Sequence, residues 1–313
     1  MRLIVTGASG FIGRNMLLRV PRDWDIVAVY HAALDFPSFL EREQLRNVRA
    51  IRCDLCVPSD VQALRTAAGD ADAALYLAAN GDPAASVRDP LRDLRLNTVA
   101  LLTFLEHCPV PHLVYLSSGA VYVGLAGLVT PVSHVNPKLP YAISKLACEQ
   151  YVQWSADHRQ SPATFVNVRF FGAYGPYEPL RKITTRFLTA LKRGDRRFTL
   201  RGDGRNLIDF MYVNDAVDGL IRLLEAPRGT RTTVDFASGQ PVEIGEIVRA
   251  MVAVAGADIA IDHDGTTAEY IEFRSADRTM AEQFGIVPQV SFEDGFRQLQ
   301  VFVATHDDAA VRG

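Results

Sequence analysis

The stretch LIVTGASGFIG, residues 3–13, decides the fold of this chain. Its first three residues are apolar, as in a short buried strand, and glycines then recur every three positions, at Gly7, Gly10 and Gly13. Glycine at these points permits a tight turn and lets a pyrophosphate come close to the backbone N–H groups. A helix that begins at the turn adds free N–H donors and the positive end of its dipole. The stretch therefore predicts a strand, a turn and a helix that together bind a dinucleotide.

The second strand of the predicted βαβ unit runs from Asp25 to Tyr30. Many NAD-binding proteins carry an acid at the end of this strand to hold the ribose hydroxyls, but here Tyr30 and His31 occupy that place and Asp35 comes too late. Without the acid, nothing repels the 2′-phosphate of NADP, and Arg14 and His31 are candidates to bind it. We predict NAD as the cofactor, with NADP as an open alternative. The expected contacts in this part of the chain are Gly7, Ser9, Gly10, Phe11, Ile12, Gly13, Arg14, Tyr30 and His31.

Strand-like apolar segments continue to alternate with helical ones along the chain. Further strands are expected at 48–52, 73–79, 113–116, 164–169 and 233–237, and helices at 94–107, 141–158, 184–193, 213–225 and 242–253. The alternation predicts an α/β fold, with a Rossmann-type, doubly wound parallel sheet and a smaller, mixed α/β C-terminal region for the substrate. We predict a dinucleotide-binding domain at 1–170, joined by the late strand at 233–237, and a substrate-binding region at 171–313 that ends in a frayed tail from about Thr305.

The residues that follow each strand are the next candidates, because ligands of such a sheet bind at the carboxyl ends of its strands. Asp54 and Leu55 follow the third strand and are expected against the adenine. Ala78 and Ala79 end the fourth strand, where their small side chains let a cofactor lie close. Asn97, within the next helix, is either a further cofactor contact or a partner of nearby backbone groups.

Length and composition are those of an ordinary globular protein. The chain has 313 residues, of which 48% are hydrophobic and 22% charged, and its net charge of −3 gives no electrostatic case for nucleic acid or an anionic membrane as a partner. No apolar run reaches the roughly 18 residues of a membrane span, and the N-terminus lacks a secretory pattern. Four cysteines in a chain of this length fit a reducing cytoplasm. The CxxC at 53–56 has no second pair of ligands, so we predict no metal site.

A serine at a strand end, together with a tyrosine and a lysine one helical turn apart, forms the candidate catalytic group. Ser117 and Ser118 follow the strand at 113–116, at the ligand-binding edge of the sheet. Tyr141 and Lys145 are four residues apart in a predicted helix and therefore share one face. An ammonium group near a phenol favours the phenolate and lowers a pKa that is normally about 10. We expect Tyr141 to exchange a proton with a substrate oxygen and a serine to hydrogen-bond that oxygen. Tyr141 and Lys145 are also expected to contact the cofactor, Lys145 at the nicotinamide ribose.

Several motifs place the chain near a known family: TGASGFIG at 6–13, Asp54-Leu55, SSGAVY at 117–122, YAISK at 141–145, RFFGAYGP at 169–176 and FMYVNDAV at 210–217. With these motifs, nearly the whole chain resembles the extended short-chain dehydrogenase/reductase family of nucleotide-sugar epimerases, reductases and dehydratases. The resemblance implies that the catalytic hydroxyl lies four residues before Tyr122, at Ser118, which leaves Ser117 as a substrate contact or a strand-end hydrogen bonder. It also implies a nucleoside-diphosphate sugar as substrate and a homodimer through the helices at 94–107 and 141–158.

The chain departs from this family pattern at three places. Dehydratases of the family carry acids just after the catalytic hydroxyl, where this chain has Gly119 and Ala120, so we do not expect a dehydratase. Gly172 stands where an asparagine usually lies near the sugar diphosphate, and Ile208 replaces the arginine before the Asp-Phe pair. Because the planar fork of arginine matches phosphate oxygens, another arginine is expected to compensate. The expected substrate contacts are Ser117, Ser118, Gly172, Arg205 and Arg274.

Three functions stay open at this point. The first is an NAD(P)-dependent nucleotide-sugar 4-epimerase, which acts through a transient 4-keto intermediate and keeps its cofactor bound. The second is an NAD(P)H-dependent reductase of a nucleotide-linked 4-keto sugar, which the missing acid at Tyr30 favours. The third and most remote is a non-catalytic dinucleotide sensor, which would not need Ser118, Tyr141 and Lys145 together.

Overall fold

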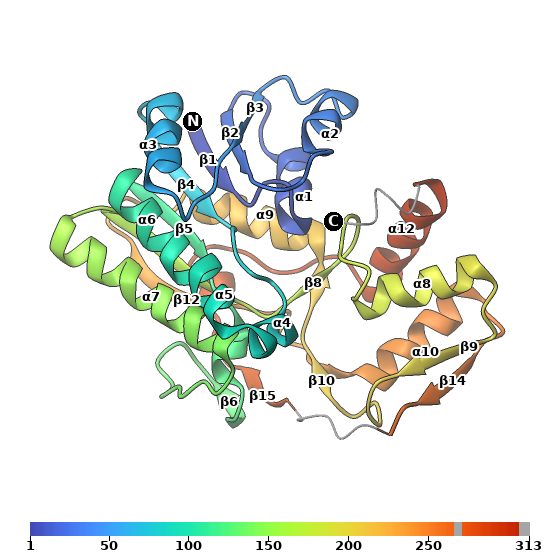
Figure 1. The fold of residues 1–313 in the computed structure, drawn as a ribbon. Coiled ribbons are helices and arrows are strands. Elements are labelled where there is room, and N and C mark those ends of the chain that lie inside the picture. The colour runs from blue at the N-terminus through green and yellow to red at the C-terminus, as the bar shows by residue number, and fades with distance from the viewer. Residues whose placement is uncertain (266–270, 307–313) are drawn as a thin grey trace.

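The computed structural model describes residues 1–265 and 271–306 and is built around a seven-stranded sheet (Figure 1). The strands lie in the order β12-β7-β5-β4-β1-β2-β3, and every neighbouring pair is parallel. They are β1 (Arg2–Thr6), β2 (Asp25–Tyr30), β3 (Val48–Arg52), β4 (Ala73–Tyr76), β5 (His112–Leu116), β7 (Thr164–Phe170) and β12 (Arg231–Phe236). The strand order reverses between β1 and β4, as in a doubly wound Rossmann sheet, which confirms the predicted fold class.

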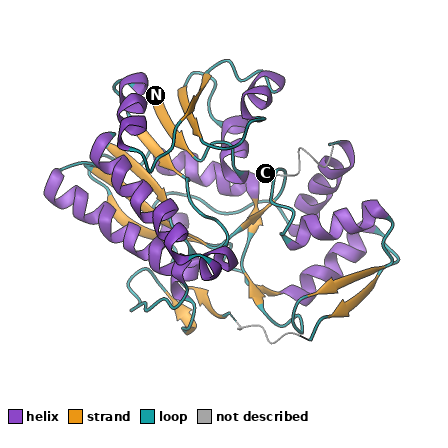
Figure 2. Ribbon diagram, in the orientation of Figure 1, coloured by secondary structure: helices purple, strands orange, loops and turns teal. Residues whose placement is uncertain are grey.

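Helices cover both faces of the sheet (Figure 2) because its strands are apolar on both sides. On β1, for example, Leu3 and Val5 belong to one core and Ile4 to the other. The first core is closed by α1 (Phe11–Arg19), α2 (Phe36–Arg42) and α9 (Val213–Leu224), and the second by α3 (Pro58–Ala68), α6 (Ala100–His107) and α7 (Pro140–Arg159). The loops at the carboxyl ends of the strands are therefore carried by a rigid, fully covered layer.

The helix expected at 94–107 is present, but it is not α-helical throughout. The chain forms α4 (Pro83–Arg88), α5 (Pro90–Leu94) and a π-helical turn, η1 (Arg95–Val99), before α6 begins. Within η1, Asn97 is only 2% exposed, and its side chain accepts a hydrogen bond from the backbone of the loop after β4. Asn97 thus connects the π turn to the loop after β4. The apolar periodicity of the sequence does not reveal this contact.

The C-terminal region is a second, mixed α/β body beside the sheet. Its elements are α8 (Ile183–Arg193), β9 (Arg197–Leu200), β10 (Leu207–Ile208), β13 (Val242–Glu243), α10 (Ile244–Ala255), β14 (Ala260–His263), α11 (Thr279–Glu282) and α12 (Phe292–Thr305). Strands β9 and β14 pair in parallel and β10 and β13 antiparallel. The helix expected at 242–253 begins two residues later than predicted, because Val242 and Glu243 pair with β10.

The chain passes between the two regions more than once. Helix α9 lies beyond residue 170, yet it packs against α1, β4 and β5, and so belongs to the Rossmann layer in addition to the expected late strand, β12. Two short parallel pairs join other distant segments: β8 (Ala173–Tyr174) with β11 (Met211–Tyr212), and β6 (Ala126–Val129) with β15 (Glu272–Ser275). A single domain boundary at residue 170 therefore does not separate the two regions, because α9 follows this residue and still packs in the Rossmann layer.

The end of the chain is described as far as residue 306, where α12 has just ended. Most of the tail predicted to be frayed, 307–313, lies outside the described residues. Among the residues that the structure describes, no helix combines the length and apolar character needed to cross a bilayer.

Candidate active site

The glycine turn between β1 and α1 is a close-packed backbone cradle. Gly7 has a φ of 64°, and a Cβ on it would lie 2.8 Å from the Ala78 nitrogen. A Cβ on Gly13 would lie 2.5 Å from the Ala8 carbonyl oxygen. Gly10 is the N-cap of α1 and supplies no side-chain hydrogen bond, so the first N–H groups of the helix stay available. A turn that only glycine fits, at an uncapped helix N-terminus, suits a pyrophosphate.

A cavity of about 340 Å³ adjoins this turn, and we call it the cofactor-side cavity. The predicted cofactor contacts that line it are Gly7, Ser9, Gly10, Tyr30, His31, Asp54, Leu55, Ala78 and Ala79. Leu96 and Ala100 add an apolar wall from η1 and α6. Phe11, Ile12 and Gly13 lie next to it in the first turn of α1. Small and apolar side chains around a glycine cradle fit a dinucleotide, whose flat rings and phosphates need these two environments.

Arg14, one of the two candidates for a 2′-phosphate, is engaged inside the protein. Its guanidinium donates to the Ser9 carbonyl at 2.8 Å and to the Asp35 carboxylate at 2.7 Å, and its side chain is 4% exposed. Arg14 therefore braces the glycine turn and does not line the cavity. His31 does line it, is 59% exposed and lies 3.9 Å from the Asp54 carboxylate, so it stays the candidate for that phosphate.

Asn97 lies next to the cofactor-side cavity without lining it. Its Oδ1 accepts a hydrogen bond from the Asn80 backbone N–H at 2.7 Å, and its Nδ2 donates to Asp93 at 3.0 Å. Asp93 in turn accepts a hydrogen bond of 2.6 Å from Ser144 on α7. Asn97 thus holds the loop after β4 in place, which is the role of a backbone partner that the sequence left open.

Ser118, Tyr141 and Lys145 come together near the carboxyl end of β5. The Ser118 hydroxyl accepts a hydrogen bond from Ala120 N–H at 3.1 Å in the short 3₁₀ turn η2 (Gly119–Tyr122) and is also hydrogen-bonded with the Tyr141 side chain. The Lys145 ammonium lies 5.9 Å from the centre of the Tyr141 ring and donates to the Leu116 carbonyl at 2.8 Å. The three residues predicted to be catalytic are therefore neighbours in space.

The electrostatics of this group differ in part from the expectation. Burial raises the pKa of Tyr141, while the hydrogen bond with Ser118 and the charge of Arg181 act in the opposite direction. Burial lowers the pKa of Lys145 to about 8. Lys145 faces the ring of Tyr141, and the cation that favours the phenolate is Arg181, which the sequence reasoning missed. Arg181 precedes α8 and donates to the Gly81 carbonyl at 2.7 Å, across the loop after β4.

A second cavity, of about 330 Å³, has Ser118 in its wall, and we call it the substrate-side cavity. The loops after β4, β5 and β7 contribute to it, together with β10 and β15. Ser118 is the one predicted substrate contact that lines it. The other predicted substrate contacts lie outside its walls and stay predictions: Ser117, Gly172, Arg205 and Arg274.

The positions of those four residues have simple physical causes. Ser117 is 3% exposed and points to the opposite side of the chain from Ser118, as successive residues of an extended segment do. Gly172 packs on the Asp209-Phe210 backbone, where a Cβ would lie 3.4 Å from the Phe210 Cβ. The Arg205 side chain is 76% exposed and lies 3.8 Å from Asp203, and Arg274 is exposed on β15.

Residues 3–239 match the family model described as "NAD dependent epimerase/dehydratase family". The chain belongs to the NAD-dependent epimerase/dehydratase family. The resemblance inferred from the motifs is thereby confirmed, and the glycine turn, the catalytic group and the cofactor-side cavity all lie within the matched residues.

Curated relatives in this family have different activities. The dTDP-glucose 4,6-dehydratase of Streptomyces griseus is 29% identical, over 94% of this chain and 91% of that protein. The GDP-6-deoxy-D-mannose reductase of Pseudomonas aeruginosa is 26% identical, over 95% of each chain. Among solved structures, the UDP-glucuronic acid 4-epimerase from Bacillus cereus, in complex with UDP-glucuronic acid and NAD, shares the fold with a TM-score of 0.87 at 22% identity, over 97% of this chain and 99% of that one.

This family member also has a buried ion pair beside the catalytic group, which sequence reasoning missed. Glu149 lies one helical turn after Lys145 on α7, and its carboxylate pairs with Arg169 of β7 at 2.8 Å. The Ser117 hydroxyl donates to the same carboxylate at 2.5 Å. The Glu149 and Arg169 side chains are 5% and 6% exposed. The spacing of Tyr141, Lys145 and Glu149, four residues each, was the signal in the sequence that places all three on one face.

The ion pair extends into a longer hydrogen-bonded network. Arg169 donates to the Tyr122 hydroxyl at 2.8 Å, and Tyr122 donates to Asp235 of β12 at 2.7 Å. Ser275 of β15 donates to the other Asp235 oxygen at 2.7 Å. Burial raises the pKa of Asp235 to about 6. The network therefore ties the catalytic helix to the segment that forms one wall of the substrate-side cavity.

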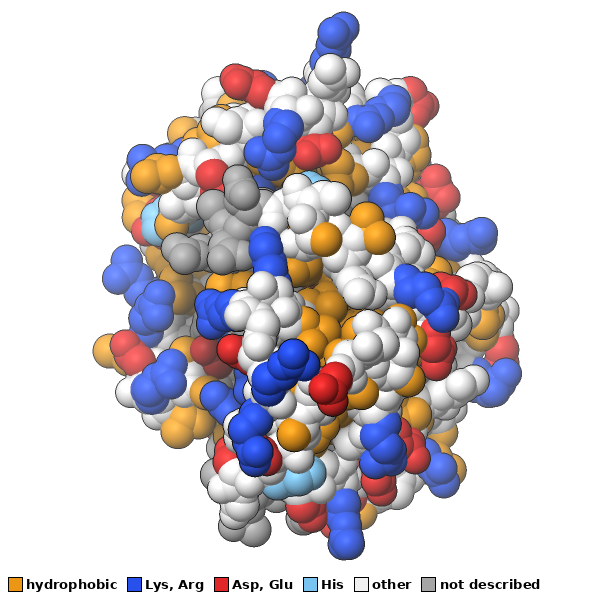
Figure 3. All heavy atoms as spheres, turned by 90° about the vertical axis from the view of Figure 1, so that its right-hand side faces the viewer, with side chains coloured by type: hydrophobic (Ala, Val, Ile, Leu, Met, Phe, Trp, Pro, Cys, Tyr) orange, Lys and Arg blue, Asp and Glu red, His pale blue; other side chains and the backbone are white. Residues whose placement is uncertain are grey.

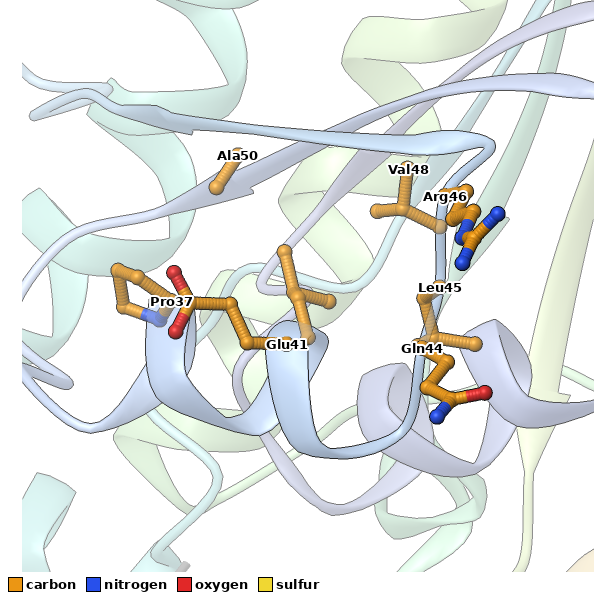
Figure 4. Close-up of a pocket in the computed structure, with 8 residues that line it drawn as sticks. Pro37, Glu41, Gln44, Leu45, Arg46, Val48 and Ala50 are labelled. Atoms are coloured by element: carbon orange, nitrogen blue, oxygen red, sulfur yellow. The ribbon is translucent and has the colours of Figure 1, made fainter.

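A further cavity lies away from this site. The cavity drawn in Figure 4, of about 480 Å³, is formed by α2 and the start of β3, at the opposite edge of the sheet from β7 and β12. All four cysteines are free thiols, and burial raises the pKa of Cys53 to about 12, which keeps it protonated. Within residues 1–265 and 271–306, no group of three or more His, Cys, Asp or Glu side chains is arranged to hold a metal ion.

Proposed function

We propose that this chain is an NAD(P)-dependent nucleotide-sugar 4-epimerase that acts through a transient 4-keto intermediate. The observation that carries the proposal is the juxtaposition of Ser118, Tyr141 and Lys145 near the end of β5. The cofactor-side cavity reaches Ala79 in the loop after β4, and the substrate-side cavity begins where this loop enters α4, at Pro83. Two cavities that share this loop suit a dinucleotide and a sugar that meet at one catalytic group.

The proposed mechanism assigns the movement of the proton to this chain's own side chains. When bound, the nicotinamide would accept hydride from the sugar carbon and return it. Tyr141 would take the proton of the sugar hydroxyl as the ketone forms and give it back afterwards, while Ser118 hydrogen-bonds the same oxygen. Lys145, with a pKa of about 8, keeps its charge at neutral pH and would hold the nicotinamide ribose, while the charge of Arg181 favours the phenolate of Tyr141.

Elimination of water is excluded from the proposal, although relatives include dehydratases. That reaction needs an acid beside the catalytic hydroxyl, and this chain has Gly119 and Ala120 there. The position also lacks room, since a Cβ on Gly119 would lie 3.0 Å from the Phe171 ring. Neither residue offers a proton to a leaving hydroxyl.

A second candidate is a reductase that consumes NAD(P)H on a nucleotide-linked 4-keto sugar. The observation in its favour is the end of β2, where Tyr30 and His31 line the cofactor-side cavity and no acid follows them there. Asp35 is drawn away by its ion pair with Arg14 at 2.7 Å. Without an acid at this place, the cavity would accept the 2′-phosphate of NADP. NADPH suits a reductase, whose cofactor is consumed and exchanged in each turnover.

We also propose that the protein works as a cytoplasmic homodimer through α5, η1 and α7. Large apolar side chains on these elements are exposed: Leu91 at 76%, Leu94 at 45%, Val99 at 41%, Ile143 at 50%, Tyr151 at 39% and Trp154 at 42%. Exposed apolar side chains gathered on one helical surface are typical of a protein interface. Light scattering would test this, since Ile143→Asp should yield a monomer.

The decisive experiment for the activity is incubation with a panel of nucleotide sugars. An epimerase forms the C4 epimer, detected by NMR, with no net change in nicotinamide absorbance. A reductase instead oxidises NAD(P)H in proportion to the 4-keto sugar consumed. Tyr141→Phe should abolish either reaction but leave binding of the dinucleotide intact. Full activity in that variant would refute the proposed proton transfer.

A further inference from the structure

Among the described residues, the side chains that line the substrate-side cavity are apolar except for Ser118 and Asp209. The large apolar side chains among them are Leu139, Phe171, Leu207, Ile208, Ile271 and Phe273. The Phe171 and Phe273 rings are 6.1 Å apart, and Phe273 also packs on Tyr122 at 5.7 Å within a small buried core. Packing therefore fixes the orientation of these rings, so this part of the wall presents apolar surface to the cavity.

The two polar side chains in the cavity wall, Ser118 and Asp209, are already engaged in other interactions. Ser118 belongs to the catalytic group. Asp209 is 8% exposed, and its two carboxylate oxygens accept hydrogen bonds from the backbone of Ser238 at 2.6 Å and of Gly239 at 3.2 Å. Asp209 thus holds the turn after β12 in place. A substrate that fills the cavity finds its hydrogen-bonding partner at the Ser118 end.

The described residues of these walls also carry no positive charge. Lysine and arginine side chains are spread over the face of the second region in Figure 3, but none of the described residues that line the cavity is Lys, Arg or His. A hydroxyl turned toward such a wall loses its water without gaining a partner, and a carboxylate loses much more. The cavity therefore favours an uncharged, apolar substituent next to the reacting carbon.

We propose that the substrate-side cavity selects a nucleotide-linked 6-deoxy sugar, whose methyl group packs against Phe171, Ile208 and Phe273. This inference rests on the proposed function, in which the oxygen on C4 is held by Ser118. The C6 group of a hexose is bonded to C5, the direct neighbour of C4, so it enters the same cavity as the reacting carbon. A methyl group gains from burial there, whereas a hydroxymethyl group or a carboxylate brings a polar group without a partner.

The test compares nucleotide sugars that differ only at C6, with the nucleotide and the C4 configuration held constant. We expect kcat/KM to be about 10–100-fold higher for the methyl compound than for the hydroxymethyl compound, which is the range for one added hydroxyl in an apolar pocket. The uronate should be the poorest of the three. Equal or faster turnover of the hydroxymethyl sugar or the uronate would overturn the inference and leave the 4-epimerase proposal standing.

A variant that adds a polar partner to the wall sharpens this test. Ile208 is half-buried on the short strand β10, so Ile208→Gln is tolerable and offers an amide to a hydroxyl. The preference for the methyl sugar should fall at least threefold in this variant. Leu128→Gln is the matched control, because Leu128 is 64% exposed on β6 and lies outside the cavity wall, and it should leave the preference unchanged. An unchanged preference in Ile208→Gln would contradict the assignment of the wall.

Binding separates this inference from the proposed activity. Calorimetry with the Tyr141→Phe variant, loaded with NAD, measures affinity for the three sugars without turnover. Tighter binding of the methyl sugar combined with no turnover of any nucleotide sugar by the wild type would refute the 4-epimerase and keep the selectivity. Equal binding of all three sugars would refute the selectivity, whatever the reaction.

Discussion

Replacing Arg169 by methionine tests whether the buried network supports the catalytic helix. Arg169 donates from Nε to both oxygens of Glu149 at 3.1 Å and from Nη2 to one of them at 2.8 Å. Methionine fills similar space without a donor. The substitution leaves the Glu149 carboxylate buried, with the Ser117 hydroxyl as its remaining side-chain partner.

The expected loss of stability follows from the burial of the pair. Removing one partner of a buried ion pair costs about 3–5 kcal/mol, because the other charge stays desolvated and unpaired. The lost hydrogen bonds from Arg169 to the Tyr122 hydroxyl and the Pro131 carbonyl act in the same direction. With an unfolding entropy of about 2.1 cal/mol/K per residue, a loss of ~4 kcal/mol lowers the Tm of a 313-residue chain by about 6 °C.

The assay is urea denaturation of four proteins: wild type, Arg169→Met, Glu149→Gln and the double variant. Since the double variant carries no unpaired charge, it should be more stable than Arg169→Met alone, with a coupling free energy of about 2–4 kcal/mol. Arg197→Met is the matched control. Arg197 pairs with Asp262 at 2.6 Å, but its side chain is 70% exposed, so the same substitution should cost less than about 1 kcal/mol.

Two results would refute this reasoning. One is a cost below about 1 kcal/mol for Arg169→Met, comparable to that of the exposed control. The other is strict additivity of the two single variants, which would mean that Glu149 and Arg169 do not depend on each other. Turnover adds a functional readout, because Glu149 lies one turn from Lys145 and Ser117 is next to Ser118. We expect Arg169→Met to lower kcat more than it raises KM.

Three further predictions concern the turn, the network and the cofactor. Gly13→Ala should lower the Tm measured without cofactor more than Gly10→Ala does, because its Cβ would lie 2.5 Å from a carbonyl oxygen instead of 3.3 Å; equal shifts would contradict the packing. Burial raises the pKa of Asp235 from 3.8 to about 6, so the native state binds this proton more tightly and gains stability as pH falls through that window. Calorimetry should therefore show the wild type gaining stability relative to Asp235→Asn between pH ~6 and ~4, and parallel curves would disprove the shift. His31→Asp should weaken binding of NADP about tenfold more than binding of NAD, since a carboxylate repels the 2′-phosphate; equal losses in titrations of both cofactors would exclude His31 from that site.

The sequence allowed the Rossmann sheet and the proximity of Ser118, Tyr141 and Lys145 to be predicted, because both depend on short-range patterns. A buried strand followed by glycines at fixed spacing is readable locally, and so is the i, i+4 pair of Tyr141 and Lys145. The strand register then follows from the doubly wound topology, which brings Ser118 to the same edge. These features need no knowledge of contacts between distant segments.

The features that the sequence did not reveal depend on such contacts. Arg181 contacts the loop after β4 at Gly81, a hundred residues away in the sequence. A single arginine in a loop has no sequence pattern from which this contact could be predicted. Strands β9 and β14 are short, with 59 residues between them, so neither shows its partner in the sequence. The affinity of arginine for phosphate does not determine where a side chain points, and Arg205 and Arg274 are both exposed outside the substrate-side cavity.

The buried network gives a physical reason why the substrate wall and the proton-transfer group form one unit. β15 contributes Phe273 to the cavity wall and Ser275 to Asp235. From Asp235, the hydrogen bonds run through Tyr122 and Arg169 to the catalytic helix. Because each buried polar group in this series needs its neighbour, β15 cannot shift without leaving one of them unpaired. The second region thus supplies both a wall of the substrate-side cavity and a tie that fixes that wall relative to α7, the helix that carries Tyr141.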